Sequence, residues 1–319
     1  ITGGGPDIFL VKYNSAGTKQ WIKQFGNAIN DGGSAVAADS AGNIYVAGYT
    51  KGGLDGNTSP GGMDGFLAKY NSAGTKQWTK QLGTSANDLG TGVTVDSAGN
   101  IYVAGYTGGG LDGNTSAGSN DIFLVKYNSA GTKQWTKQLG TSENDYGYGV
   151  TADSADNIYV AGNTGGGLDG NTSAGSDDVF LVKYNSAGTK QWTKQFGTNA
   201  LEQGWSVTAD SADNIYVAGT TVGGLDGNTS AGDKDVFLVK YNSAGTKQWT
   251  KQFGNQYGQS GYGVTADSAD NIYVTGMTGL GLDGNTHYGG GLDIFLVKYN
   301  SAGTKQWTQQ LGTSSADYG

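Results

Sequence analysis

The sequence KYNSAGTKQW at residues 12–21 decides the fold, because the chain repeats it five more times. The other copies begin at Lys69, Lys126, Lys183, Lys240 and Lys298. Their spacing is 57 residues and increases to 58 only before the last copy. A fixed period of this length predicts a tandem array of one supersecondary unit, in which each unit packs on its neighbours.

Four strand-like runs make up one repeat. They read YGVTADS, NIYVAGNT, DVFLVKYNS and TKQWTKQFG, at residues 148–154, 157–164, 178–186 and 189–197. Turns rich in Gly, Asn and Asp separate them, and the loop GGGLDGNTSAGSD at residues 165–177 lies between the second and third runs. Short β-branched and aromatic runs bounded by such turns are typical of strands. The repeat therefore predicts an all-β propeller built of four-stranded antiparallel blades.

The order of the runs predicts how many blades the chain forms. Residues 1–26 hold only a third and a fourth strand, which is half a blade. Five complete blades follow in a single repeat array, at about 27–83, 84–140, 141–197, 198–254 and 255–319. This count predicts either a six-fold ring that further strands would complete or a five-fold ring with a spare hairpin. Both ends of the chain fall inside a repeat, so we expect a segment of a longer protein.

An incomplete blade leaves an unpaired strand edge, which invites a partner. Three completions remain open on the sequence alone. Residues beyond 319 could supply the missing strands, another molecule could donate them, or copies of the chain could join into an assembly such as a filament.

Composition excludes several classes of protein. The formal net charge is −8, and all 19 basic residues are Lys, so the guanidinium fork that favours phosphate and guanine is missing. We therefore expect no nucleic-acid partner. There is no Cys, and no apolar run approaches the roughly 20 residues that span a bilayer. We expect no disulfide, no thiol chemistry and no membrane span.

Side-chain size predicts the order of strands within a blade. The first run carries small residues such as Ala152, which suit the innermost position. The fourth run carries Trp192 with Lys190 and Lys194, whose long stems can cover an outer rim. We expect the rings of Phe180 and Trp192 to pack between blades, and the six tryptophans of the KQW segments to be core residues.

Variation between repeats locates a candidate binding surface, because nearly identical repeats carry no other signal. Two residues before the core Val of the first strand, the repeats carry Ser34, Thr91, Tyr148, Trp205 and Tyr262. Three large aromatic residues thus follow one another, and Tyr146 is a fourth nearby. They predict either a stacking platform for sugar rings or a peptide, or rings that only plug the centre of the blades.

The loop between the second and third strands is a candidate calcium site. It repeats LDGNT and is followed by an aspartate at the start of the third strand. Oxygen ligands at such spacing suit Ca²⁺, although the acidic positions of an EF-hand loop are incomplete. The alternative is a simple Asx-turn. The candidate ligands are Asp112, Asn114, Asp121, Asp169, Asn171 and Asp178.

Catalytic groups are scarce. The only histidine, His287, lies in a loop that occurs once, and without Cys neither a repeated zinc site nor a thiol nucleophile can form. Asp177 and Asp178 are adjacent in only one repeat, which makes a glycosidase pair improbable. We expect no enzymatic activity and no catalytic residue.

The run DIFLVKYNSAGTKQWTKQLGTSENDYGYGVTADSADNIYVAGNT at residues 121–164 resembles the bacterial β-propeller repeat family known as SBBP. The resemblance covers essentially the whole chain. It implies a propeller fold and an exported or cell-surface location, and it transfers no catalytic residue. The long GGGLDGNTSAG loop and the uniformity of the repeats depart from the usual family pattern.

These inferences predict a non-catalytic extracellular propeller that serves as a display, interaction or assembly module at a bacterial surface, including filament formation. Its expected partners are other copies of itself, surface proteins or glycans. The alternative is a multivalent lectin that uses Tyr146, Tyr148, Trp205 and Tyr262.

Overall fold

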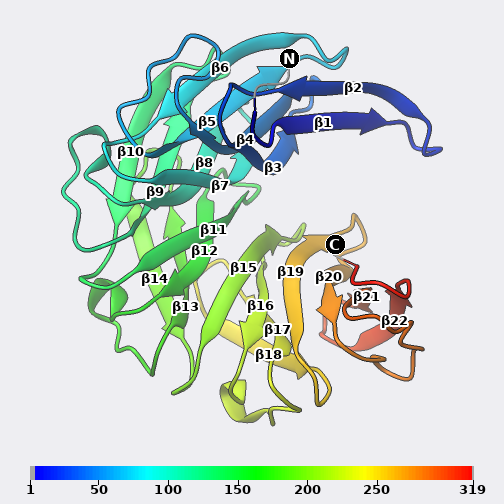
Figure 1. The fold of residues 1–319 in the computed structure, drawn as a ribbon. Coiled ribbons are helices and arrows are strands. Elements are labelled where there is room, and N and C mark those ends of the chain that lie inside the picture. Colours follow the sequence, from blue (N-terminus) through cyan, green and yellow to red (C-terminus); the bar gives the residue numbers. More distant parts are fainter. Residues whose placement is uncertain (1–3, 318–319) are drawn as a thin grey trace. The chain divides into compact units, whose positions relative to one another are not determined.

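A computed structural model describes residues 4–317 of this chain (Figure 1). Its sheets are antiparallel: five have four strands each, and one has two. The prediction of five complete blades preceded by a half blade is therefore confirmed. The structure divides into two compact units, Ile1–Gly147 and Tyr148–Gly319, and each is described by itself.

Unit 1 contains the half blade and the first two complete blades. The half blade is β1 (Ile8–Tyr13) and β2 (Lys19–Phe25). Blade 1 consists of β3 (Asp31–Ala38), β4 (Ile44–Lys51), β5 (Met63–Tyr70) and β6 (Lys76–Leu82). Blade 2 consists of β7 (Asp88–Val95), β8 (Ile101–Thr107), β9 (Asp121–Tyr127) and β10 (Lys133–Leu139), with a 3₁₀ turn, η1 (Leu111–Gly113), before β9.

Unit 2 contains the last three blades, although β11 begins in the final residues of unit 1. Blade 3 consists of β11 (Asp145–Ala152), β12 (Ile158–Thr164), η2 (Leu168–Gly170), β13 (Asp178–Tyr184) and β14 (Lys190–Phe196). Blade 4 consists of β15 (Glu202–Ala209), β16 (Ile215–Thr221), η3 (Leu225–Gly227), β17 (Asp235–Tyr241) and β18 (Lys247–Phe253). Blade 5 consists of β19 (Gln259–Ala266), β20 (Ile272–Thr278), β21 (Asp293–Tyr299) and β22 (Lys305–Leu311).

The third strand is the most apolar of each blade because it lies between two other strands and between two blades. In β17 the segment VFLV is completely buried. Alternate side chains of a strand point to opposite faces, so Phe237 and Val239 pack toward blade 3, while Val236 and Leu238 pack toward blade 5. A strand buried on both faces reads as a continuous apolar run.

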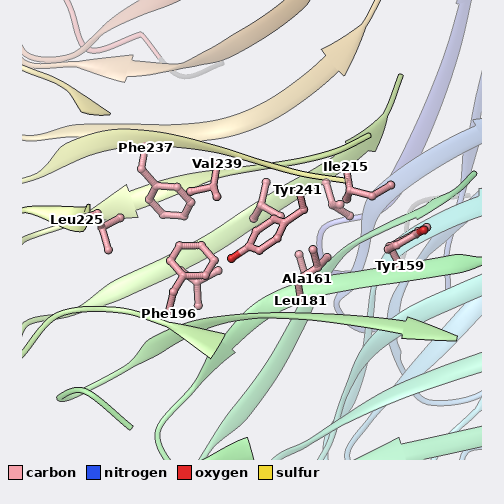
Figure 2. Close-up of a cluster of buried hydrophobic side chains, with 12 residues drawn as sticks. Tyr159, Ala161, Leu181, Phe196, Ile215, Leu225, Phe237, Val239 and Tyr241 are labelled. Atoms are coloured by element: carbon pink, nitrogen blue, oxygen red, sulfur yellow. The ribbon is translucent and has the colours of Figure 1, made fainter. Parts of the chain in front are cut away.

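Neighbouring blades meet at seams, by which we mean the apolar packing between the facing sides of two consecutive sheets. Figure 2 shows the seam between blades 3 and 4, where Tyr159 and Leu181 of blade 3 face Phe237 and Tyr241 of blade 4. The ring of Phe196 meets that of Phe237 edge to face at 5.8 Å. Equivalent clusters join blades 4 and 5, blades 1 and 2, and the half blade and blade 1.

The first strands are the innermost of each unit, as the small side chains predicted. β3 packs against β7, and β15 packs against β19. Three first strands also contact the second strand of the preceding blade: β7 contacts β4, β15 contacts β12, and β19 contacts β16. The fourth strand forms the other edge of each sheet.

The first strand starts earlier than the sequence pattern indicated. β11 begins at Asp145 rather than at Tyr148, and the first strands of the other blades begin at equivalent residues. Their first residues pair with the end of the second strand, as Glu202 does with Thr221. A segment such as Glu202-Gln203-Gly204, which combines polar residues with Gly, has the composition of a loop. The sequence pattern therefore did not indicate this part of the strand.

Five of the six tryptophans of the KQW segments are half-buried and the sixth, Trp307, is exposed, so the prediction that they are core residues was wrong. Trp192 packs on the edge of the seam cluster beside the ring of Tyr159, at 5.8 Å. It lies on the fourth strand, which has only one neighbouring strand in its sheet. Phe180 is completely buried, as expected.

Candidate functional site

Three of the four aromatic residues in the candidate binding surface form a row in unit 2. Tyr148, Trp205 and Tyr262 belong to the first strands of consecutive blades. The ring centroids of Tyr148 and Trp205 are 4.5 Å apart, and those of Trp205 and Tyr262 are 5.8 Å apart. Tyr262 is 36% exposed. The indole Nε1 of Trp205 is buried and has no hydrogen-bond partner among residues 4–317.

β-Bulges explain why this position varies from blade to blade. The pairing of β15 with β16 shifts register between Gly204 and Ser206, which leaves Trp205 as the extra residue. Tyr262 is the extra residue in β19. A bulge leaves one residue out of the ladder and redirects its side chain. The position therefore tolerates residues of very different size.

The fourth aromatic candidate, Tyr146, packs on residues of unit 1. It lies in unit 1, where its ring meets that of Tyr106 edge to face at 4.8 Å. Its hydroxyl accepts a hydrogen bond of 3.3 Å from the side-chain amide of Asn120. Burial raises the pKa of Tyr106, and the neighbouring tyrosines add to this.

The calcium candidates of blade 2 are held by other protein groups. Asp112 has a positive φ of 53° and pairs with the ammonium group of Lys133. The side-chain amide of Asn114 donates to the Leu111 carbonyl at 2.7 Å, a local bond to the backbone within the loop. Asp121 accepts hydrogen bonds from other groups, the backbone N–H of Ala117 and the amide of Gln138.

Blade 3 repeats this arrangement. Asp169 pairs with Lys190, and Asn171 donates to the Leu168 carbonyl at 2.7 Å. Asp178 accepts hydrogen bonds from Ala174 N and Gln195 Nε2, both at 2.8 Å. The two carboxylates of a loop thus belong to separate hydrogen-bond networks. In residues 4–317 no group of three or more His, Cys, Asp and Glu side chains is placed to hold a metal ion. Calcium binding stays a prediction from the sequence.

The aspartate at the start of a third strand can belong to a buried acidic pair, which the sequence did not reveal. In the seam between blades 1 and 2, Asp64 and Asp88 are both completely buried. Asp88 accepts hydrogen bonds from Thr107 Oγ1 and from Thr84 N. Burial raises the pKa of Asp88 despite these bonds, and the charge of Asp64 raises it further.

One oxygen of this pair has no partner. Asp64 Oδ2 accepts from Gln81 Nε2 at 2.8 Å, whereas Asp64 Oδ1 is buried without a hydrogen bond in the described part of the chain. The seam between blades 3 and 4 holds an equivalent pair, Asp178 and Glu202. A Cβ placed on Gly197 would lie 2.1 Å from Asp178 Oδ1 and 2.8 Å from Glu202 Oε2. Two acceptor oxygens thus face one small space, where only a glycine fits.

Seam faces are exposed at two places in the chain. On the half blade, Phe9 is 72% exposed, whereas its equivalents Phe123 and Phe237 are fully buried against the preceding blade. On blade 5, Leu311 is 70% exposed, whereas the equivalent Leu82 of blade 1 is 5% exposed. A hollow of about 480 Å³ lies beside Leu311 and is lined by Thr275, Ile294, Phe295 and Leu296.

Within residues 4–317, the polar contacts that close an internal seam are not seen at these two faces. Within the units, a third-strand lysine donates to the carbonyl of a turn serine in the next blade, as Lys69 does to Ser129 at 2.9 Å. A turn glycine of the next blade also lies against the fourth-strand tryptophan of the preceding blade, as Gly131 of blade 2 does with Trp78 of blade 1. Trp307 of blade 5 is 37% exposed, and Gly17 of the half blade has no atom within 4 Å of an added Cβ.

The remaining acidic and basic candidates have structural partners. His287 Nδ1 lies 3.1 Å from Asp293 Oδ2, beside the start of β21. Asp177 accepts a hydrogen bond of 3.0 Å from Asn163, and burial raises its pKa. No helix in the described residues is long and apolar enough to cross a membrane.

Comparison with known proteins places the repeats in a family. The model of the family described as "Beta-propeller repeat", SBBP, matches five times, at residues 20–55, 77–112, 134–169, 191–226 and 248–279. These matches cover more than half of the chain. Each match runs from a fourth strand through the next blade's first two strands, so the repeat of the sequence is offset from the blade of the structure.

Two relatives share 26% identity with the chain. One is an uncharacterized WD repeat-containing protein, L264, of Acanthamoeba polyphaga mimivirus, matched over 73% of this chain and 23% of that protein. The other is the regulatory protein FlaEY of Caulobacter vibrioides, matched over 69% of this chain and 25% of that protein. The chain spans about a quarter of the length of these relatives.

Solved structures share the fold at low identity. A hydrazine synthase of Kuenenia stuttgartiensis matches with a TM-score of 0.54 at 10% identity, over 88% of this chain and 66% of that one. The WD40 domain of Neurospora crassa Pan2 matches with a TM-score of 0.50 at 10% identity, over 87% of this chain and 65% of that one. These likenesses concern the fold alone.

Proposed function

This chain belongs to the SBBP β-propeller repeat family, and on that premise we propose that it is a non-catalytic module for interaction and assembly outside the cell, at a bacterial surface. Its partners in this proposal are other copies of the chain, which it binds through the exposed seam faces of the half blade and blade 5. The extracellular location rests on the family resemblance.

The exposure of Phe9 and Leu311 is the observation that supports this proposal most directly. Both occupy positions that are buried at the internal seams, and both are at least 70% exposed. Burying one such side chain stabilises a contact by about 1.5–3 kcal/mol. Contiguous exposed apolar residues of this kind mark interaction surfaces.

The two faces also have complementary residue types. At an internal seam, Leu238 and Phe253 of blade 4 pack against Phe295 and Tyr299 of blade 5. Blade 5 offers the equivalent of the first pair as Leu296 and Leu311, and the half blade offers the equivalent of the second pair as Phe9 and Tyr13. Two different surfaces that match give a heterologous contact, which joins copies head to tail.

Sedimentation velocity over a wide range of concentrations tests the proposal. We expect the weight-average mass to rise with concentration, and Leu311→Asp to weaken association at least tenfold. Tyr257→Asp is the matched control, because Tyr257 is 52% exposed in the loop between β18 and β19 and lies outside both faces. A chain that stays monomeric at every concentration would contradict self-assembly.

Glycan binding is the second candidate function, and the row of Tyr148, Trp205 and Tyr262 favours it. Aromatic faces stack on sugar rings, and the unpaired Nε1 of Trp205 is a donor available to a ligand that enters the row. A glycan array followed by titration of tryptophan fluorescence tests this. Binding that survives Trp205→Phe, which removes the donor and keeps a ring, would exclude the proposed role of Nε1.

A further inference from the structure

Acidic residues of two blades meet beside Gly197, the residue that follows β14, in the seam between blades 3 and 4. Asp178 begins β13, Glu202 begins β15 of the next blade, and both side chains are completely buried. The backbone also joins the two blades here, because the N–H of Glu202 donates to the carbonyl of Asp177 at 2.9 Å. Buried carboxylates are costly unless a partner neutralises their charge.

One oxygen of each carboxylate faces the same space. Glu202 Oε2 accepts a hydrogen bond of 2.6 Å from the backbone N–H of Thr198. Asp178 Oδ1 is buried and has no hydrogen-bond partner among residues 4–317. These two oxygens lie 2.8 and 2.1 Å from one point, the position of a Cβ on Gly197, so they are close neighbours. Two acceptors that face each other call for a positively charged group between them.

We propose that a calcium ion binds in this seam between Asp178 Oδ1 and Glu202 Oε2. The site differs from the loop site that the sequence predicts, in which Asp178 acts together with Asp169 and Asn171 of its own blade. In the structure, Asp169 pairs with Lys190, and the partner of Asp178 comes from the next blade. The inference goes beyond the proposed function and does not depend on it.

The ligand chemistry favours calcium over other cations. Carboxylate oxygens are the hard ligands that Ca²⁺ prefers, and its two charges match those of Asp178 and Glu202. Mg²⁺ keeps several of its waters, which suits a buried seam poorly, and zinc favours His and Cys. Ca²⁺ takes six to eight oxygen ligands, so backbone carbonyls and water complete the site. With two carboxylates we expect a Kd of roughly 10⁻⁴–10⁻³ M.

Asp177 adds a third negative charge at this place. Burial raises the pKa of Asp177, and the charge of Asp178 adds to this, so the two carboxylates act on each other. Blade 3 is the only blade with an acidic residue just before the aspartate that begins the third strand. The other blades carry Met63, Asn120, Lys234 and Leu292 at this position. The added charge strengthens the attraction for a cation.

The seam between blades 4 and 5 has the same geometry with less negative charge. Asp235 Oδ1 has no partner in the described chain, and it lies 2.0 Å from the position of a Cβ on Gly254. Gln259 Oε1 lies 2.5 Å from that point, in the place of Glu202 Oε2. Lys234 stands where blade 3 has an aspartate. One negative and one positive charge replace three negative charges, so we expect no calcium in this seam.

The acidic pairs of the first two seams differ in geometry or exposure. Between blades 1 and 2, the three atoms nearest to the equivalent point all belong to Asp64 and extend to 3.1 Å, so Asp88 lies farther away. At the half blade, Asp7 Oδ1 and Asp31 Oδ2 lie 2.5 and 2.7 Å from that point. Asp7 is only half-buried, and contact with water weakens its attraction for a cation.

The experiment uses the full chain, freed of metal by a chelator and then titrated with CaCl₂. Equilibrium dialysis against radioactive calcium measures binding, and thermal denaturation measures the stability that binding adds. We expect saturable binding and a rise in Tm with calcium, and no comparable rise with MgCl₂ at equal ionic strength. Glu202→Gln should weaken binding at this site at least tenfold. Glu143→Gln is the matched control, because Glu143 is exposed.

The fold of the Glu202→Gln variant is safeguarded by the chain itself, since Gln259 occupies the equivalent position in blade 5. In chelator, this variant should melt at the same temperature as the wild type or higher, because it lacks one buried charge. A variant that has lost only calcium binding thus differs from one that is generally destabilised.

A gain of binding supplies the converse test. Lys234→Asp combined with Gln259→Glu copies the acidic residues of blade 3 into the next seam and should add one bound calcium per chain. Leu311→Asp, which weakens the proposed self-association, should bind calcium like the wild type, so the two proposals fail separately. A wild-type chain that binds no calcium at about 10 mM, or calcium binding that Glu202→Gln leaves unchanged, would overturn the inference.

Discussion

The indole ring of Trp78 lies beneath Gly131, which belongs to the turn between the third and fourth strands of the next blade. A Cβ on Gly131 would come within 2.9 Å of the ring. The same relationship joins Trp192 to Gly245 and Trp249 to Gly303. The turn of one blade thus closes the outer end of the preceding seam.

This contact predicts that Gly131→Ala destabilises the chain more than an equivalent turn substitution. Gly131 has a φ of 78°, and an alanine there would suffer both the backbone strain and the clash with Trp78. We expect a loss of about 2–4 kcal/mol, of which about 1–2 kcal/mol comes from the left-handed conformation.

Gly99→Ala is the control, because Gly99 lies in the same blade with a φ of 77° and no atom within 4 Å of an added Cβ. Gly99→Ala should lose only the stability that corresponds to the left-handed backbone conformation, about 1–2 kcal/mol. Urea denaturation followed by near-ultraviolet circular dichroism compares the two variants. Equal urea midpoints for Gly131→Ala and Gly99→Ala would show that the contact between Gly131 and the Trp78 ring does not restrict this position.

Asp213 fastens blade 4 to blade 3. It has a positive φ of 60°, and its carboxylate accepts hydrogen bonds of 2.9 Å from both the N–H and the hydroxyl of Ser154. Asp213→Ala removes the bonds and keeps the strained backbone, so we expect it to cost about 1–3 kcal/mol. Asp213→Gly also removes the bonds, but it relieves the strain and should cost about 1 kcal/mol less. Thermal denaturation of the two variants checks this order. An Asp213→Ala variant that is more stable than the Asp213→Gly variant would refute it.

The buried acids predict that Asp64→Asn is tolerated. The change removes a negative charge from a completely buried pair and places an amide donor where Oδ1 has no partner. Blade 5 already carries an uncharged residue, Gln259, in the position of Asp88. We expect the variant to be as stable as the wild type at pH 7, or more stable by about 1 kcal/mol.

The sign of the pH dependence follows from the raised pKa of Asp88. Burial and the charge of Asp64 favour the protonated form of Asp88 in the folded chain, so the pair destabilises the fold increasingly as the pH rises above the unfolded pKa. The advantage of Asp64→Asn should therefore shrink as the pH falls toward 4. A variant that is strongly destabilised at pH 7 would disprove this reading of the pair.

Asp267 predicts an acid-sensitive turn in blade 5. Hydrogen bonds from the side chain and backbone of Asn271, together with one from Tyr273, lower the pKa of Asp267 to about 2. A depressed folded pKa gives stability that is complete above the unfolded value and is lost as the pH falls through about 2. Asn271→Ala should raise the pKa toward its ordinary value. Carbon-13 NMR titration of the Asp267 carboxyl measures it, with Asn43→Ala, in another blade, as the control that should leave it unchanged.

The repeat period and the strand pattern predicted the four-stranded blades, because local alternation and turn residues determine them. β13 shows this: its apolar run lies within the segment that the sequence indicated. The start of β11 at Asp145 was missed, since Asp145-Tyr146-Gly147 has the composition of a loop. The rim position of the tryptophans depends on which strand is outermost and on a glycine of the next blade, which no local pattern records.

The candidate sites were harder to predict than the fold. Variation between repeats identified Trp205 and Tyr262, because a bulge frees that position from the ladder. Tyr146 was grouped with them by its place in the sequence, although its ring packs on Tyr106. Asp121 and Asp178 were assigned to loop calcium sites because their role at the seams depends on residues in other strands.

Near-identical seams have a consequence for how such a gene can change. Within a unit, neighbouring blades pack through the same tyrosine, valine and phenylalanine positions. The seam residues therefore do not depend on where a blade stands in the order of blades. Recombination between repeats that deleted or duplicated one of them would still give every remaining face a fitting neighbour. Copy number can therefore drift by whole blades without creating a misfit inside the array.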